Sequence, residues 1–226
     1  DKTPAKDTVK LVIETETGTV SKTILVGGHP PGPQLEQQDR AKMESIVHDP
    51  SVRAKQRKNS AHDDQQAADL MTMLPKAFLW TETGRSNREI TLHFKPNPAF
   101  QPPNYASRVF ANMAGEMVVD SAQKRLKVLS GTLTRPVQFG WGLLGKLQEG
   151  GTFHIVRSEV APGAWEITQT HVHINGHILF FKSISEQEDE ITSHYKPTPA
   201  GLTLEQAVEM LTSGAAAKAL QVPEAQ

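Results

Sequence analysis

Histidine is the residue type in this sequence with the clearest potential for chemistry. Nine histidines are present, and His171, His173 and His177 lie close together. Two histidines separated by one residue on a β-strand point to the same face, a geometry that can bind a metal ion. We expect Asn175-Gly176 to form a two-residue hairpin turn, which pairs Ile174 with His177 and turns His177 to the opposite face. The sequence therefore favours a solvated or hydrogen-bonded histidine pair, and ranks a metal enzyme or hydrolase using His171 and His173 last.

Other catalytic and cofactor-binding patterns are missing from the sequence. There is no cysteine, which excludes disulfides, thiolate catalysis and cysteine-ligated metal. Neither a G-x-S-x-G elbow nor a glycine-rich phosphate loop occurs. The carboxylates Glu186, Glu188, Asp189 and Glu190 are interpreted as a solvated hairpin loop. We therefore expect a protein that is not an enzyme and that has no metal and no cofactor.

The charge balance argues against a nucleic-acid partner. Lys and Arg number 24 against 25 Asp and Glu, a formal net charge of −1 over 226 residues. Non-specific nucleic-acid binding needs a concentrated basic face. The basic stretch Arg53 to Lys58 lies beside Asp49, Asp63 and Asp64 and is interpreted as a solvated helix face. No apolar run approaches the roughly 18 to 20 residues that span a bilayer, so no transmembrane segment is expected.

Two apolar features allow either a structural or a functional interpretation. Phe139 to Leu147 is a glycine-hinged hydrophobic segment, which is either a loop plugged into the core or a flap over a cavity. Met113, Met117 and Val119 alternate along a strand, and they are either ordinary core or the adaptable wall of an apolar cavity. Both interpretations stay open in each case.

The elements that position these residues begin with a short hairpin and helices. Val9 to Ile13 and Val20 to Val26 are expected to pair as a hairpin. A polar helical stretch, 34–60, is broken at Asp49-Pro50, because the residue before proline avoids the α region. A better helix presents Ala67, Leu70, Met71 and Leu74 on one face and ends at Pro75.

The rest of the chain is predicted to form an antiparallel sheet and a last helix. Strands that follow one another without long helices between them indicate a meander. The expected strands are Glu89 to Phe94, Arg108 to Asp120, Arg125 to Thr134, Thr152 to Val160, Trp165 to Ile174, His177 to Lys182 and Ile191 to Tyr195. Thr203 and Gln206 make a capping box for the C-terminal helix, which is expected to stop at Gly214.

Two sets of motifs resemble known groups of proteins. Met113-Ala-Gly-Glu-Met-Val-Val-Asp120, followed by a basic turn and Arg125-Leu-Lys-Val-Leu129, resembles the G-x-x-W-I-D … R-L hairpin of LolA/LolB-like proteins, bacterial periplasmic carriers of lipoproteins. Here Met117 or Val118 stands where an aromatic residue is common. A second resemblance, to uncharacterised secreted bacterial proteins, covers about residues 75 to 213. Its motifs are Leu92-His-Phe-Lys-Pro-Asn-Pro-Ala-Phe100, Arg108-Val-Phe110, Phe139-Gly-Trp-Gly142 and Gly150-Gly-Thr-Phe153, continued by Trp165 and Gly176 to Lys182.

The resemblance implies an α+β fold and an exported protein. The expected fold is an unclosed antiparallel β-barrel, or half-barrel, whose concave apolar face is covered by helices. We expect one LolA/LolB-like domain over 1–226: a lead-in and hairpin at 1–33, a helical segment at 34–75, the sheet and C-terminal helix at 76–214, and a tail at 215–226. The expected location is periplasmic or secreted.

The leading functional expectation is a non-enzymatic carrier or binding protein for an apolar ligand, such as a lipid acyl chain or lipoprotein anchor. The alternative is an interaction module with a packed barrel that binds a protein partner of the cell envelope through the 34–60 helix. The candidate ligand-binding residues are Phe94, Met113, Met117, Trp141, Leu144, Phe153 and Trp165. The candidate lid is the helix stripe Ala67, Leu70, Met71 and Leu74.

Overall fold

The computed structural model describes residues 7–139, 145–178 and 181–220, without the side chains of residues 139, 177, 178, 181–187 and 220. The chain divides into two compact units. The first consists of residues 1–66 and 194–226, and the second consists of residues 67–193. The single domain expected from the sequence thus comprises two units, and each is described by itself.

The first unit is built on the predicted N-terminal hairpin. Strands β1 (Thr8–Thr15) and β2 (Gly18–Val26) pair antiparallel. Leu11, Ile13 and Val20 are buried, as alternation along a half-buried strand requires. They pack with α1 (Pro33–His48) and with the C-terminal helices α4 (Leu204–Thr212) and α5 (Ala215–Leu220). The C-terminal helix, expected beside the large sheet, therefore packs on the hairpin.

Local backbone chemistry sets the ends of the helices. α1 stops at His48 because Asp49, which precedes Pro50, is extended, and Asp49 Oδ1 accepts a 2.8 Å hydrogen bond from the Ser51 N–H. α2 (Pro50–Ala77) then runs unbroken. The separate helix expected to end at Pro75 is the last part of α2, and the chain stays helical to Ala77 because the φ of proline is itself helical.

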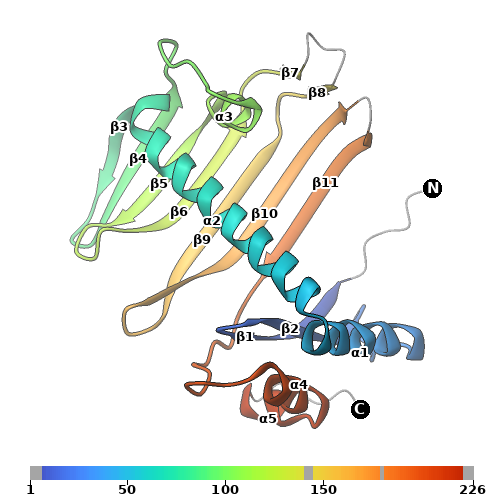
Figure 1. Cartoon of the computed structure of the whole chain (residues 1–226). Helices are drawn as coiled ribbons and strands as arrows, with labels where there is room; N and C mark the ends of the chain where they lie inside the picture. The colour runs from blue at the N-terminus through green and yellow to red at the C-terminus, as the bar shows by residue number, and fades with distance from the viewer. Residues whose placement is uncertain (1–6, 140–144, 179–180, 221–226) are drawn as a thin grey trace. The chain divides into compact units, whose positions relative to one another are not determined.

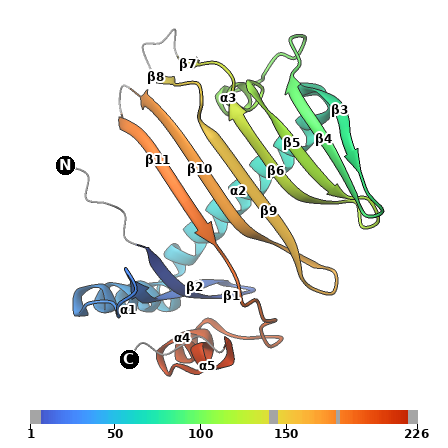
Figure 2. The ribbon, with the colours of Figure 1, turned by 180° about the vertical axis from the view of Figure 1, so that it is seen from behind.

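The second unit is a nine-stranded antiparallel sheet that is not closed into a barrel, as expected (Figures 1 and 2). The strand order is β3-β4-β5-β6-β9-β10-β8-β7, and β11 pairs with β10 and forms an edge. The strands are β3 (Phe78–Arg85), β4 (Glu89–Pro96), β5 (Met113–Asp120), β6 (Arg125–Leu133), β7 (Val137–Phe139), β8 (Gly145–Leu147), β9 (Thr152–Ala161), β10 (Ala164–Ile178) and β11 (Phe181–Ile191).

The expected strand Arg108 to Asp120 is wrong in its first part. Residues Tyr105–Phe110 form the short helix α3, and β5 begins at Met113. The helix starts because Asn104 Oδ1 accepts hydrogen bonds of 2.8 Å from both the N–H and the hydroxyl of Ser107. An N-cap contact of this kind outweighs the β propensity of the Arg108-Val-Phe run.

The expected hairpin turn at Asn175-Gly176 is also wrong, because β10 continues through both residues to Ile178. Gly176 pairs with Leu147 on β8 and with Ile184 on β11. A Cβ on Gly176 would lie 2.7 Å from both Leu147 Cδ2 and the Lys146 carbonyl oxygen. Glycine is therefore present to allow the close approach of β8 rather than to make a turn.

Two further sequence predictions about the last strands are corrected by this register. The carboxylates 186–190, expected in a loop, lie within β11, since Glu188 pairs with Val172 and Asp189 pairs with His171. The strand expected at Ile191 to Tyr195 does not form, because β11 ends at Ile191. The edge strand of the sheet is thus strongly acidic.

Candidate functional site

The two faces of the large sheet differ in polarity: one is mainly apolar, and the other is more polar but also carries the row Val118, Val128 and Val156. Direct cross-strand partners lie on the same face, so the register defines each face residue by residue. We call the apolar face the set formed by Leu92, Phe94, Met113, Met117, Leu129, Leu133, Phe153, Ile155, Val172 and Ile174. On the opposite face, one row runs through His93, Glu116, Ser130, His154, His171 and Asp189.

One part of the apolar face is closed by packing. Phe94 and Met113, two candidate ligand-binding residues, are buried in a core cluster with Phe78 and Leu74. The ring centroid of Phe78 lies 4.7 Å from that of Phe94 and 5.1 Å from that of Phe110 on α3. Both pairs are in an edge-to-face arrangement. Over β3 to β6 the sheet is therefore filled by α3 and the end of α2.

The apolar face is less covered where it continues across β9 and β10. Phe153, Ile155, Val172 and Ile174 are only half-buried. Phe153 and the candidate residue Met117 pack at the margin of the core cluster. The strands thus carry an apolar surface beyond the part that the helices fill.

The candidate lid contributes a single buried side chain. Leu74 lies in the core cluster and Leu70 is half-buried, whereas Ala67 is exposed and Met71 retains 46% of its accessible surface. The apolar stripe of this part of α2 is therefore mostly uncovered. Apolar surface on a helix and on a sheet of the same unit is thus only partly covered.

The remaining candidate residues lie apart from this cluster. Trp141 and Leu144 lie outside the described residues. Trp165 is buried, but its indole Nε1–H donates a 2.7 Å hydrogen bond to Gln123 Oε1 beside a polar pocket. The structure therefore brings together Phe94, Met113, Met117 and Phe153 with Leu74, and it places Trp165 elsewhere.

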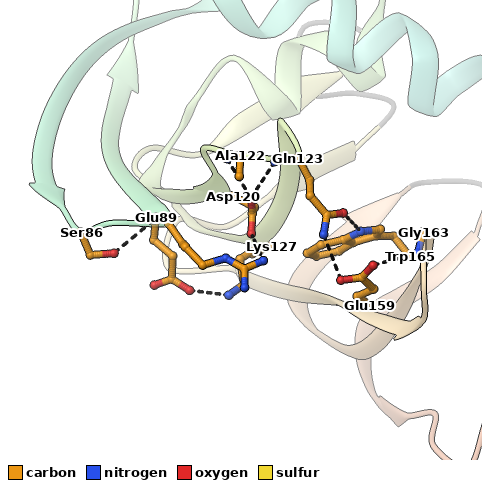
Figure 3. Close-up of polar contacts among 10 residues, drawn as sticks. Ser86, Glu89, Asp120, Ala122, Gln123, Lys127, Glu159, Gly163 and Trp165 are labelled. Carbon is orange, nitrogen blue, oxygen red and sulfur yellow. Dashed lines mark hydrogen bonds and ion pairs between the residues drawn. The ribbon is translucent and has the colours of Figure 1, made fainter.

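The polar pocket has a volume of about 300 Å³ and lies where the β5–β6 and β9–β10 turns meet the start of β4 (Figure 3). Three cationic and three anionic side chains contribute to it. Its lining residues are Arg88, Glu89, Asp120, Lys127, Arg157, Ser158, Glu159 and Trp165. Lys127 pairs with Glu89, and Arg88 lies 3.6 Å from Asp120.

Neutral donors are the largest cause of the lowered pKa values of two carboxylates in this pocket, Asp120 and Glu159. The backbone N–H of Gln123, followed by that of Ala122 and by the cation Arg88, holds the pKa of Asp120 below its ordinary value, although burial opposes this. The N–H of Gly163 and then the Gln123 amide similarly lower the pKa of Glu159. The charges are compensated within the pocket, which therefore ties the turns together.

Sequence reasoning missed this pocket. Its residues lie on or beside five strands, β4, β5, β6, β9 and β10, and their ion pairs join positions as far apart as Glu89 and Lys127. The local signal was an Asp at the end of a strand before a polar turn, a pattern typical of a side chain that caps the following N–H groups. That pattern identifies the turn at Asp120 but not its partners.

The histidine pair takes part in polar contacts on the face opposite the apolar one. His171 Nδ1 contacts Asp189 Oδ1 across β10 and β11, and Asn175 Nδ2 lies 3.0 Å from His173 Nε2. Within the described ranges, no three His, Asp or Glu side chains form a group that could hold a metal ion. Among those same residues, no helix combines the length and the apolar character needed to cross a bilayer.

Comparisons of the chain with models of protein families, with curated proteins and with solved structures found no match. By its fold, the chain is an α+β protein with an open nine-stranded antiparallel sheet.

Proposed function

We propose that the protein is a non-enzymatic binding or carrier protein that holds an apolar ligand, such as a lipid acyl chain or lipoprotein anchor, against the apolar face of its open sheet. The observation that carries the proposal is the half-burial of Phe153, Ile155, Val172 and Ile174 beside a fully packed core. Contiguous exposed apolar surface is typical of ligand and partner sites.

The energetics of apolar burial are sufficient for such a role. Burying a methylene group is worth about 0.8 kcal/mol before the cost of ordering the chain. An acyl chain along β9 and β10 would cover side chains that are only half-buried. No nucleophile, metal or cofactor is needed for this, and the polar pocket has a structural explanation in its internal ion pairs.

A periplasmic or secreted location belongs to the same proposal. It is supported by the resemblance of the Met113 to Leu129 hairpin to that of LolA/LolB-like carriers. Cell fractionation of the full-length gene product in its own host tests this part. Recovery of the protein with cytoplasmic markers would contradict it.

The binding experiment uses a matched pair of variants on one strand. Ile155 and Val156 are neighbours on β9 and both are half-buried, but they point to opposite faces of the sheet. We expect Ile155→Asn to weaken binding of a nonionic dodecyl ether about tenfold or more, and Val156→Asn to leave it nearly unchanged. Calorimetric titration below the micelle concentration measures both affinities.

Chain length provides a second readout. A decyl ether should bind about tenfold more weakly than a dodecyl ether, because two methylene groups are lost from the buried part. Native mass spectrometry of protein from its own host should also show a co-purified lipid. Absence of binding to every nonionic acyl probe, or equal effects of the two asparagine variants, would refute the proposal.

A second candidate function, binding of a protein partner through the helical segment, is favoured by one observation. Residues 57–69 of α2 are exposed without interruption. Met43 and Ile46, the apolar residues of α1 in this segment, are already buried, whereas the start of α2 continues into the exposed stretch. Capture of a partner that is lost when the surface charges Arg57 and Lys58 are replaced by Ser would support it, and unchanged capture would contradict it.

A further inference from the structure

The acidic edge strand borders the apolar face. Glu188 pairs with Val172, which in turn pairs with Phe153 on β9. Glu190 pairs with Thr170, which pairs with Ile155. Because direct partners share a face, both glutamates lie on the apolar face, Glu188 one strand beyond Val172 and Glu190 two strands beyond Ile155. Adjacent strands are about 4.8 Å apart, so these carboxylates are within reach of a group bound over β10.

Both glutamates are available to an external cation. Glu188 and Glu190 are exposed, and no cation among the described residues forms an ion pair with either. Asp189, between them, points to the opposite face and contacts His171. The face therefore has a negative border at β11 that nothing described neutralises.

A described positive charge on this face, Arg157, pairs with Ile167 on β10 and lies two strands from β11. Arg157 follows Ile155 by two residues along β9, so it has the same orientation. Its Nη2 donates a 2.9 Å hydrogen bond to the Trp165 carbonyl oxygen, and Glu159 follows two residues later. Arg157 is thus engaged and has an acidic neighbour, whereas the glutamates of β11 are not engaged by any described cation.

We propose that the ligand of the apolar face is an amphiphile with a cationic head group, whose chain lies over Phe153, Ile155 and Val172 and whose head group lies beside Glu188 and Glu190. This inference rests on the proposed function and names the chemical class of its ligand. A primary amine, a quaternary ammonium group or a lysine side chain next to an acyl chain has the required chemistry.

Edge protection is the competing explanation of the charges. Charged side chains on an edge strand prevent its pairing with another chain, whichever face they occupy. Asp189 serves that purpose as well as its two neighbours do. Recognition of a head group, in contrast, requires charges on the face that binds the ligand. It therefore predicts an effect for Glu188 and Glu190 but none for Asp189.

The experiment compares three probes with the same dodecyl chain: dodecyltrimethylammonium, laurate and a nonionic dodecyl ether. Each is titrated calorimetrically into the full chain below its micelle concentration. We expect the cationic probe to bind about five- to tenfold more tightly than the nonionic one, and laurate more weakly, because two exposed carboxylates each contribute a modest attraction. The preference should shrink as salt is raised from about 0.02 to 0.5 M.

Variants of β11 test which residues cause the preference for the cationic probe. The double variant Glu188→Gln/Glu190→Gln should abolish the preference for the cationic probe and keep the affinity for the nonionic one. Asp189→Asn, which removes a charge from the same strand on the other face, should keep the preference. The preference of the unmodified protein and its salt dependence need no variant, so the test survives a variant that folds poorly.

The outcomes distinguish this inference from the function on which it rests. If the nonionic ether binds but the cationic probe is not preferred, or the preference persists in the double variant, the head-group inference is wrong and the proposed function stands. Tighter binding of laurate than of the cationic probe would overturn it as well. If no dodecyl probe binds, both fail.

Discussion

The ring of Phe153 lies against the Cα of Gly131 on the neighbouring strand. The two residues are direct partners between β9 and β6, and a Cβ added to Gly131 would lie 2.7 Å from Cε1 and 3.0 Å from Cζ of the ring. Gly115 on β5 pairs with Gly131 on its other side. Glycine at position 131 lets the aromatic ring of Phe153 lie on the sheet beside the proposed ligand surface, and glycine at position 115 allows the close approach of the β6 backbone at Ser130 and Gly131.

Gly131→Ala is therefore expected to destabilise the protein by about 1–3 kcal/mol, because the ring of Phe153 must shift in a packed region. Gly84→Ala is the matched control, since its Cβ would stand 3.5 Å from Thr91, an ordinary contact, and it should change stability by less than about 0.5 kcal/mol. Urea denaturation measures both. Equal stability of the two variants would show that the ring moves without cost.

The parts of the fold that depend on neighbouring residues could be predicted from the sequence. The helix break at Asp49-Pro50 follows from the backbone restriction before proline, and the start of the last helix follows from its capping box. The apolar runs Val9 to Ile13 and Val20 to Val26 correctly predicted the hairpin. Each of these signals lies within a few residues of the structure that it specifies.

The parts that depend on distant residues could not be predicted. Gly176 looks like a turn residue until β8, thirty positions earlier in the chain, is known to lie against it. Trp165 was expected in an apolar wall, yet its indole N–H bonds to Gln123 on another turn. The division of the chain into two units likewise places the C-terminal helix on a hairpin near the N-terminus.

The capping box of α4 should contribute measurably to the first unit. The Thr203 hydroxyl accepts a hydrogen bond from the Gln206 N–H, and the Gln206 side chain accepts one from the Thr203 N–H. Thr203→Ala should cost about 1 kcal/mol, and Thr203→Ser, which keeps the oxygen, much less. Urea denaturation followed by circular dichroism compares the two, and identical transitions would contradict a role for the cap.

Trp165 and Gln123 should be energetically coupled. Gln123 accepts from the Trp165 indole at 2.7 Å and donates to Glu159 Oε2 at 3.0 Å, which links the two turns. Trp165→Phe removes the donor and should cost about 1 kcal/mol or more. A double-mutant cycle with Gln123→Ala tests the link, since the cost of Trp165→Phe should fall when Gln123 is already absent. An unchanged cost in that background would mean that the indole acts through packing alone.

Asp120 should make the stability of the protein depend on pH in the acidic range. The N–H of Gln123 is the largest of the causes that hold the pKa of Asp120 below its ordinary value in the folded state. The unfolded chain then takes up the proton first, so this contribution is fully present above about pH 4, the unfolded pKa, and is lost as the pH falls toward the folded value. We expect Asp120→Asn to flatten the dependence of the urea midpoint on pH below about 4.

A second variant identifies the cause of this pH dependence. Arg88 lies 3.6 Å from the Asp120 carboxylate and its side chain is 68% exposed, so its attraction is screened by solvent. Arg88→Met should therefore keep most of the acid dependence, since the N–H groups of Gln123 and Ala122 still donate to the carboxylate at 2.8 and 3.0 Å. If Arg88→Met flattens the curve as much as Asp120→Asn does, the ion pair rather than the turn holds the charge on Asp120.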